Sequence, residues 1–448
     1  MASPPRITRS TANWTLIGLI LLTLNLRAAI TGIPPVLGEL QDTFGLSGLE
    51  VSVLTTLPEL CLGIFSALAP VLARRFGTEA AITGALLVIT IGLLLRVFPA
   101  QSALFAGTVL AGAGMATGNV LVPAVIKRVF PRRVGSLTGL SMMLLSVGGA
   151  AAAGLAVPLD HMGGWRPALA VWAVPSLIAA LVWCPLALRG PKRPPERPAA
   201  RACESTSTAH AEARTDTHTE TRTGTHAEEG SLLRSPLAWS VMVFMGMTSL
   251  MFYTLTSWLP EMMQDHGFAP TTAGMMNSVV IIIGIPLGFV VPVVAAHLRD
   301  QRPLVLGVVA LMVIGLGGLL LAPRAGWVWI TIFGVATGSA FPIALTLLNL
   351  RSPTAAVTAR LSGMAQSGGY LLAASGPLTF GMLHSVTGGW EASIWLLLLL
   401  LVPELVCGLL AARPGFVRLS TTRPEHRMGH LAEPAVISAR STEADRSH

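Results

Sequence analysis

Apolar residues along the chain gather into twelve long segments separated by short polar loops. A helix that crosses a hydrocarbon core of about 30 Å needs about 20 mainly apolar residues. Each segment therefore predicts one transmembrane helix. The expected spans are residues 14–37, 49–72, 80–97, 102–126, 136–158, 166–188, 237–259, 271–296, 303–322, 326–349, 358–383 and 391–411.

One long polar stretch divides these spans into two sets of six. It is rich in Thr, Pro, Ala and charged residues and holds few large apolar side chains, so it cannot bury enough surface to offset chain entropy. We expect it to be a disordered linker, and the carboxy-terminal tail is similar in composition. The predicted organisation is a tail (1–13), a first bundle (14–188), the linker (189–234), a second bundle (235–411) and a second tail (412–448).

Short motifs of the first set of spans recur in the second set, in the same order and at offsets of 220, 224 and 225 residues. Three matches in register indicate an internal duplication. A duplicated six-span unit is typical of transporters that work by alternating access. The expected fold is an all-α membrane protein with two six-helix bundles related by a pseudo-two-fold axis. The paired motifs are Gly114–Gly118 with Gly334–Gly338, Leu137–Gly139 with Leu361–Gly363, and Gly163–Trp165 with Gly388–Trp390.

Composition and charge agree with a membrane protein. Mean hydropathy is +0.66 and only 12% of the residues are charged, against about 25% in soluble domains. The net charge of +8 does not indicate nucleic acid, because the basic residues lie in short loops on alternate sides of the spans. If the amino terminus is cytoplasmic, ten short-loop Lys and Arg residues face inward and three face outward. This bias predicts a multi-pass plasma-membrane protein with both termini and the linker in the cytoplasm.

Several motifs resemble those of the major facilitator superfamily, and within it the cyanate permease/2-nitroimidazole transporter subfamily. Arg74 stands where the superfamily loop usually has aspartate, and Glu59 follows Pro58 where an apolar residue is typical. The glycine–proline pair of the antiporter motif is missing from the fifth span, so the direction of transport stays open. The motifs that carry the resemblance are Asn25–Arg27, Leu54–Pro58, Leu72–Gly77, Gly118–Pro123 and Phe130–Arg133.

Arg27 lies near the middle of the first span, where a charge costs about 2.5–3.5 kcal/mol on insertion scales. It shares a helix face with Thr23 and Thr31, whereas Asn25 points elsewhere and suits a helix–helix hydrogen bond. Glu59 lies at a similar depth in the second span and is the expected partner of Arg27. From sequence, the two readings are a structural ion pair and a substrate or coupling site.

The second set of spans shows no comparable intramembrane charge and offers hydroxyl, amide and aromatic groups instead. Tyr253 and Tyr370 are the only tyrosines of the chain, and both lie on polar helix faces. The resemblance implies a central cavity formed by both halves. The candidate substrate-binding residues are Arg27, Thr31, Asn119, Tyr253, Phe341, Gln366 and Tyr370, and the candidate coupling or gating residues are Glu59, Arg74 and Arg75.

A cation in one half and neutral polar or aromatic groups in the other suit a small planar anion or a polar heteroaromatic solute. The leading hypothesis is a secondary active transporter of such a cyanate-like or nitroimidazole-like solute, with coupling to protons left open. An exporter of drug-like compounds is the alternative, and a channel or sensor is a more remote one. No Walker-type run or metal-ligand spacing occurs, so we expect no enzyme activity, no cofactor, and no partners beyond the solute, the bilayer and, if transport is coupled, protons.

Overall fold

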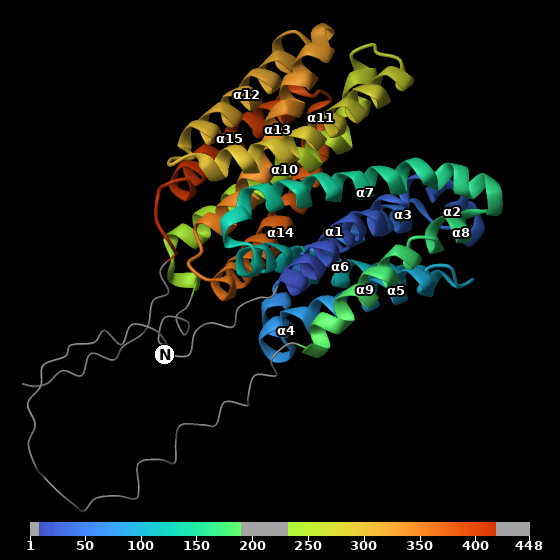
Figure 1. Cartoon of the computed structure of the whole chain (residues 1–448). Coiled ribbons are helices and arrows are strands. Elements are labelled where there is room, and N and C mark those ends of the chain that lie inside the picture. The colour runs from blue at the N-terminus through green and yellow to red at the C-terminus, as the bar shows by residue number, and fades with distance from the viewer. Residues whose placement is uncertain (1–8, 190–231, 418–448) are drawn as a thin grey trace, which may run out of the picture.

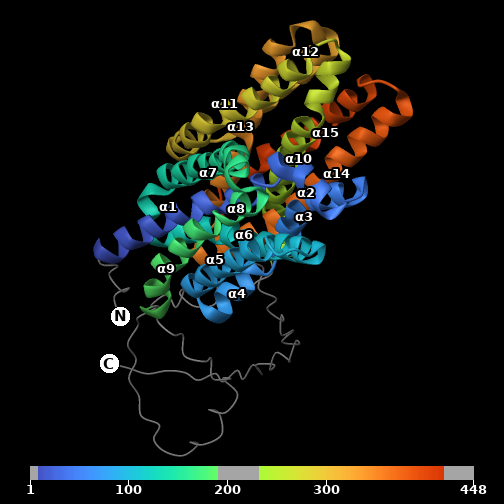
Figure 2. The ribbon, with the colours of Figure 1, turned by 90° about the vertical axis from the view of Figure 1, so that its right-hand side faces the viewer.

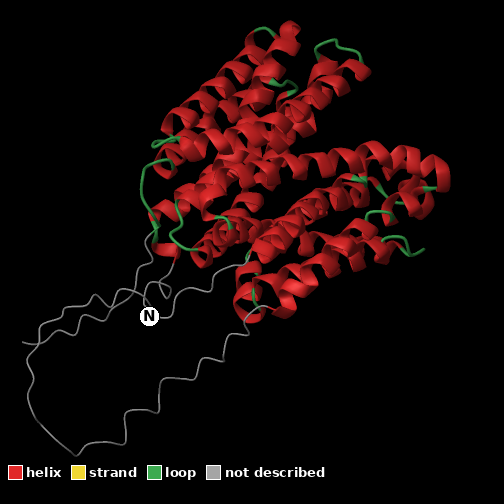
Figure 3. Ribbon diagram, in the orientation of Figure 1, coloured by secondary structure: helices red, strands yellow, loops and turns green. Residues whose placement is uncertain are grey.

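The computed structural model describes residues 9–189 and 232–417, and all of its regular elements in these ranges are helices (Figure 3). The predicted tails and most of the predicted linker lie outside the described residues. The first half contains α1 (Arg9–Thr31), η1 (Pro34–Val36), α2 (Leu37–Phe44), α3 (Gly48–Ser66), α4 (Ala69–Phe76), α5 (Thr78–Leu95), α6 (Gln101–Val129), η2 (Pro131–Arg133), α7 (Val134–Gly163), α8 (Trp165–Ala170) and α9 (Ala173–Arg189). The second half contains η3 (Leu232–Arg234), α10 (Pro236–Asp265), α11 (Pro270–His297), α12 (Arg302–Leu321), η4 (Pro323–Ala325), α13 (Gly326–Leu350), α14 (Ala355–Thr387) and α15 (Glu391–Ala411).

The helices form two bundles that lie side by side (Figures 1 and 2). Nine of the described spans are long and apolar enough to cross a membrane, and a tenth is added if α3 and α4 form one bent span. The two remaining long helices, α1 and α14, are not among these apolar spans. They carry Arg27 and Tyr370. With these two helices, each bundle has the six crossings that the apolar pattern predicts.

Prolines and glycines explain where the helices depart from the predicted spans. The second span bends by 50° between α3 and α4, because the ring of Pro70 is incompatible with a continuous helix through the carbonyl of Ser66. The first span ends at Thr31 rather than at residue 37, since Gly32 and the Pro34–Pro35 pair interrupt the helix there. The short helix α2 then lies across the end of the bundle.

Because each bundle has an even number of crossings, the chain enters and leaves it on the same side. The start of α1, the end of α9, the start of α10 and the end of the described chain after α15 all lie at this end of the molecule, which we call the terminal face (Figure 1). The opposite end, where α2 and α8 lie, is called the far face. At the far face the two bundles diverge in Figure 1.

One of the repeated motifs, Leu–Thr/Ser–Gly, lies on equivalent helices of the two bundles and brings those bundles together. A Cβ atom at Gly139 of α7 would lie 2.5 Å from the carbonyl oxygen of Phe289 in α11. A Cβ atom at Gly363 of α14 would lie 3.1 Å from the carbonyl oxygen of Ser66 in α3. Since only glycine permits such close approach, the duplicated Leu–Thr/Ser–Gly motif marks the two equivalent contacts between the halves.

Candidate functional site

A cavity of about 420 Å³ lies between the two bundles. Helices α1, α3, α6 and α7 of the first half and α10, α11, α13 and α14 of the second half form its walls. Both halves are therefore needed to complete it. Its polar or titratable lining residues are Arg27, Thr31, Glu59, Asn119, Ser146, Ser249, Tyr253, Thr256, Ser257, Thr337 and Tyr370.

Arg27 reaches the cavity from α1, and close packing against α7 fixes its stem. A Cβ atom at Gly149 would lie 3.2 Å from two methylene carbons of Arg27. The hydroxyl of Thr31 lies 2.9 Å from the carbonyl oxygen of Gly149 and 3.1 Å from that of Arg27. Thr31 therefore lines the cavity but has its proton engaged by backbone, and its main effect is to hold α1 against α7.

Glu59 faces the same cavity from α3, where Pro58 lies inside the helix. Arg27 and Glu59 interact electrostatically, but in the described part of the chain they are not joined by an ion pair within 4.0 Å. The equal depth of the two side chains, and the choice between a structural pair and a substrate or coupling site, stay predictions. Both groups remain available to the cavity.

Tyr253 of α10 and Tyr370 of α14 complete the titratable groups of the cavity. Both line the same cavity as Arg27 and Glu59. Their phenol groups combine an apolar ring with a hydroxyl that can donate or accept a hydrogen bond. Phe341 of α13 adds an aromatic wall. With Phe252 of α10, one cation, one carboxyl and four aromatic rings thus surround the same space.

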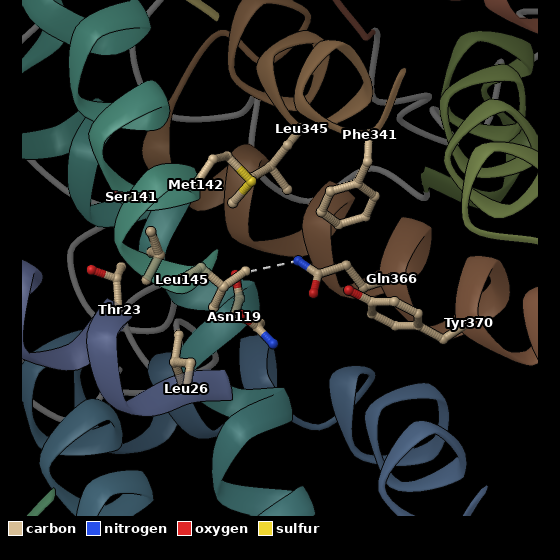
Figure 4. A pocket seen from close by; sticks show the side chains of 11 residues that line it. Thr23, Leu26, Asn119, Ser141, Met142, Leu145, Phe341, Leu345, Gln366 and Tyr370 are labelled. Carbon is tan, nitrogen blue, oxygen red and sulfur yellow. Dashed lines mark hydrogen bonds between the residues drawn. The ribbon is translucent and has the colours of Figure 1, made fainter. Parts of the chain in front are cut away.

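Gln366 lies below this cavity and joins its two walls. Its side-chain amide donates to the carbonyl oxygen of Asn119 at 3.3 Å and to the hydroxyl of Ser362 at 2.7 Å. Figure 4 shows the amide of Gln366 extending from α14 toward Asn119 of α6, within a smaller pocket that also contains Thr23 and Tyr370. We therefore assign Gln366 to the floor of the cavity, where it links the halves.

Some predicted site residues lie elsewhere. Arg74 and Arg75 are exposed on α4 at the terminal face, and the guanidinium of Arg75 lies 5.4 Å from the ring centre of Phe76. They do not line the cavity, and their gating role stays a prediction. Asn25 donates to the carbonyl oxygens of Leu21 and Pro175, which confirms its expected role between helices.

Sequence reasoning missed lining residues on α7 and one buried charge. Ser146 lies one turn before Gly149 on the helix face that Arg27 contacts, and this spacing was a usable signal. The expectation that the second half has no comparable intramembrane charge overlooked one ionisable side chain. Glu404 lies in the middle of α15 with 0% exposure, and both of its carboxyl oxygens lack hydrogen-bond partners among the described residues. It does not line the cavity.

Comparison with known proteins identifies this architecture. The model of the Major Facilitator Superfamily matches residues 19–377. The chain belongs to the Major Facilitator Superfamily. It is therefore a transporter and not an enzyme, and the superfamily fold expected from the motifs is confirmed.

Its relatives also confirm the expected subfamily. The chain is 35% identical to the uncharacterized transporter YycB of Bacillus subtilis over 90% of this chain and 94% of that protein. It is 34% identical to the 2-nitroimidazole transporter of Escherichia coli over 90% and 96%, respectively. The cyanate transport protein CynX of Escherichia coli is 26% identical over 84% of this chain and 91% of its own length.

A solved structure supports the fold independently. The proton:xylose symporter XylE superimposes with a TM-score of 0.68 over 89% of this chain and 95% of that one. Its sequence identity is only 14%, so this similarity concerns the fold alone.

Proposed function

We propose that this transporter carries a small anionic or polar heteroaromatic solute by alternating access of the central cavity to the two faces. The observation that carries the proposal is the convergence of Arg27, Glu59, Tyr253 and Tyr370 on one cavity that both halves form. Transporters of this architecture bind their solutes near mid-membrane, where the two repeats meet. The names of the relatives support nitroimidazole-like or cyanate-like cargo.

Arg27 is the group that favours an anion or a polarised planar solute. A guanidinium presents several N–H donors in one plane and can bind two acceptor atoms at once. The aromatic rings of the lining favour a flat solute, because ring faces and edges stack against planar groups. In this proposal Arg27 binds the acceptor end of the solute, and Tyr253, Phe341 and Tyr370 contact its plane.

An exporter of drug-like compounds remains a second candidate, favoured by the remainder of the lining. Much of the wall is apolar, and a cavity of about 420 Å³ lies within the range of small-molecule sites. The apolar lining residues include Leu26, Leu62, Met115, Met142, Leu145, Phe252, Val280 and Ile281. This candidate would be favoured if a substitution of one of these apolar residues reduced the flux of large apolar compounds but not that of small anions.

Glu59 is the proposed proton-coupling group. A carboxyl in this cavity can exchange its proton with whichever side the cavity faces, and the nearby charge of Arg27 opposes protonation. A solute that engages Arg27 weakens this opposition. Proton binding at Glu59 and solute binding at Arg27 would then be linked. We further propose that the terminal face is cytoplasmic, because the short loops on that side carry most of the basic residues.

Flux measurements in reconstituted vesicles test this proposal. The panel consists of cyanate, 2-nitroimidazole, related small anions and heteroaromatics, and several larger apolar compounds, each with and without a pH gradient. We expect saturable flux of at least one small planar solute, stimulation by the gradient, and loss of both in Arg27→Ala at equal membrane levels. Flux of the larger apolar compounds alone would contradict the proposal.

A further inference from the structure

Lys127 joins the two halves at the terminal face. It lies in the last turn of α6, and its ammonium group donates to the backbone carbonyl oxygens of Asn349 and Ser352 at the end of α13. Asn349 and Ser352 are fully buried. The side-chain amide of Asn349 also lies 3.5 Å from the hydroxyl of Thr138 in α7. We call Lys127, Asn349 and Ser352 the terminal-face contact.

The sequence explains why the carbonyl group of Asn349 accepts a hydrogen bond from a side chain of the other half. In a continuing helix the carbonyl of Asn349 would accept from the N–H four residues later, but that residue is Pro353, which has no N–H. The last carbonyls of a helix also carry partial negative charge, which favours a cation. Lys127 thus supplies, from the other half, the donor that α13 lacks.

Neighbouring basic residues form their bonds within one half. Arg351 donates to the carbonyl oxygens of Ala411 and Ala412 at 2.8 Å and to the side chain of Gln301, so it ties the end of α13 to its own bundle. Arg128, the residue after Lys127, pairs with Glu79 of α5. Lys127 therefore binds an end of α13 that Arg351 holds against the rest of the second half.

The hydrogen bonds between the halves gather near this face. Besides the terminal-face contact, Gln366 donates to the carbonyl of Asn119, and the hydroxyl of Ser367 donates to the carbonyl of Gly63 at 2.6 Å. Asn119 belongs both to these contacts and to the lining of the large cavity, which continues from there toward the far face along Thr31 of α1 and Ser257 of α10. The structure is thus closed at the terminal face.

We infer that Lys127 is a positioning residue that stabilises the state closed at the terminal face by capping the carboxy-terminal end of α13 in the opposite half. This inference rests on the alternating-access part of the proposed function. In the state open to the terminal face the two carbonyls must separate from Lys127. Losing the cap therefore shifts the population toward that state, without any change in the cavity.

Distances between spin labels test the inference without solute. One label pair, Arg132→Cys with Arg299→Cys, spans the terminal face on exposed residues of the two halves. A second pair, Met162→Cys with Leu321→Cys, spans the far face, where Met162 and Leu321 are 83% and 85% exposed. The full chain is used after Cys61, Cys184, Cys203 and Cys407 are replaced by Ala. The variants are Lys127→Gln, Lys127→Met and, as the matched control, Arg128→Gln.

For Lys127→Gln and Lys127→Met we expect longer terminal-face distances and shorter far-face distances. The ratio of the two states should change by about tenfold, as for the loss of a hydrogen bond to a charged group. Arg128→Gln loses a bond within one half and should keep the parent ratio. If neither neutral variant can be purified, Lys127→Arg decides. Its planar head cannot reproduce the ammonium geometry, so we expect an intermediate ratio, and a parent ratio would overturn the inference.

The outcomes separate the two proposals. If the parent populates two states whose ratio is the same in the Lys127 variants, the Lys127 inference fails while alternating access stands. If the parent and all variants populate one and the same state, both the Lys127 inference and the alternating-access proposal fail. A shift on both faces in Lys127→Gln, together with absent flux of every solute tested, would support the contact and reject only the proposed cargo.

Discussion

The two halves of the molecule agree in backbone contacts and differ in chemistry. Gly139 and Gly363 occupy equivalent places on α7 and α14, and each permits close approach of a helix from the other half. At the cavity the first half contributes Arg27 and Glu59, whereas the second contributes tyrosines and hydroxyl groups. Duplication therefore preserved the surfaces along which the halves meet, while the residues that line the cavity diverged.

This difference follows from what each position must do. A contact between helices that repack during transport needs small residues in both copies, because any added side chain would collide with backbone. A solute without two-fold symmetry needs unlike groups on its two sides. One half can then bind charge and the other can contact the plane of the solute. The predictions below test this division of roles.

The largest effect is expected at Arg27. Arg27→Lys keeps the charge but loses the planar donor geometry, so we expect flux of a small anion to fall at least about tenfold. Arg27→Ala should abolish it. Arg132→Lys, on an exposed loop at the terminal face, is the matched control and should leave flux unchanged. Initial rates at equal membrane levels provide the measurement.

A double variant separates binding from bracing. If Arg27 and Glu59 only stabilise each other, Arg27→Ala combined with Glu59→Ala should recover much of the flux, since a charge pair can often be replaced together at little cost. We expect the double variant to remain inactive although it folds, because Arg27 binds the solute in the proposed site. Full activity would remove Arg27 from the binding site.

The next effect concerns Glu59. Glu59→Gln keeps the shape of the side chain but cannot exchange a proton, so accumulation driven by a pH gradient should disappear while downhill exchange of solute continues. Uptake and counterflow in the same vesicles measure the two activities. An unchanged response to the gradient would exclude Glu59 as the coupling group and would leave it a purely electrostatic neighbour of Arg27.

The sequence was sufficient for the fold and for most of the cavity, because burial of charge in a membrane is rare enough to be informative. Arg27 and Glu59 stood out for this reason, and the polar faces of Tyr253 and Tyr370 followed from helical spacing. Gln366 was placed at the cavity instead of its floor, because spacing gives the face of a helix but not the depth at which a neighbouring helix approaches. The terminal-face contact depends on two carbonyl groups, and backbone acceptors carry no side-chain signal.

A smaller effect is expected from the tyrosines of the second half. Tyr253→Phe and Tyr370→Phe remove one hydroxyl each and retain the ring, so apparent affinity should weaken by up to about tenfold, the range for one hydrogen bond. Maximal rate and pH response should change little. Concentration-dependent uptake checks this expectation. A loss of gradient-driven accumulation in either variant would show that the coupling function extends into the second half.

The smallest effect is expected at Glu404, which is the sharpest check on the division between halves. Its carboxyl group is buried in α15, away from the cavity, and has no partner among the described residues. An ionised carboxylate without a partner is costly to bury, so the neutral acid is the form that fits this place, and Gln has nearly the same shape. Glu404→Gln should therefore leave flux and its response to a pH gradient unchanged, in contrast to Glu59→Gln in the first half. The two variants are compared in one vesicle assay, with thermal unfolding as the control for folding. If Glu404→Gln lost gradient-driven accumulation while remaining folded, proton coupling would not belong to the first half alone, and the contrast between a charged half and a neutral half would have to be abandoned.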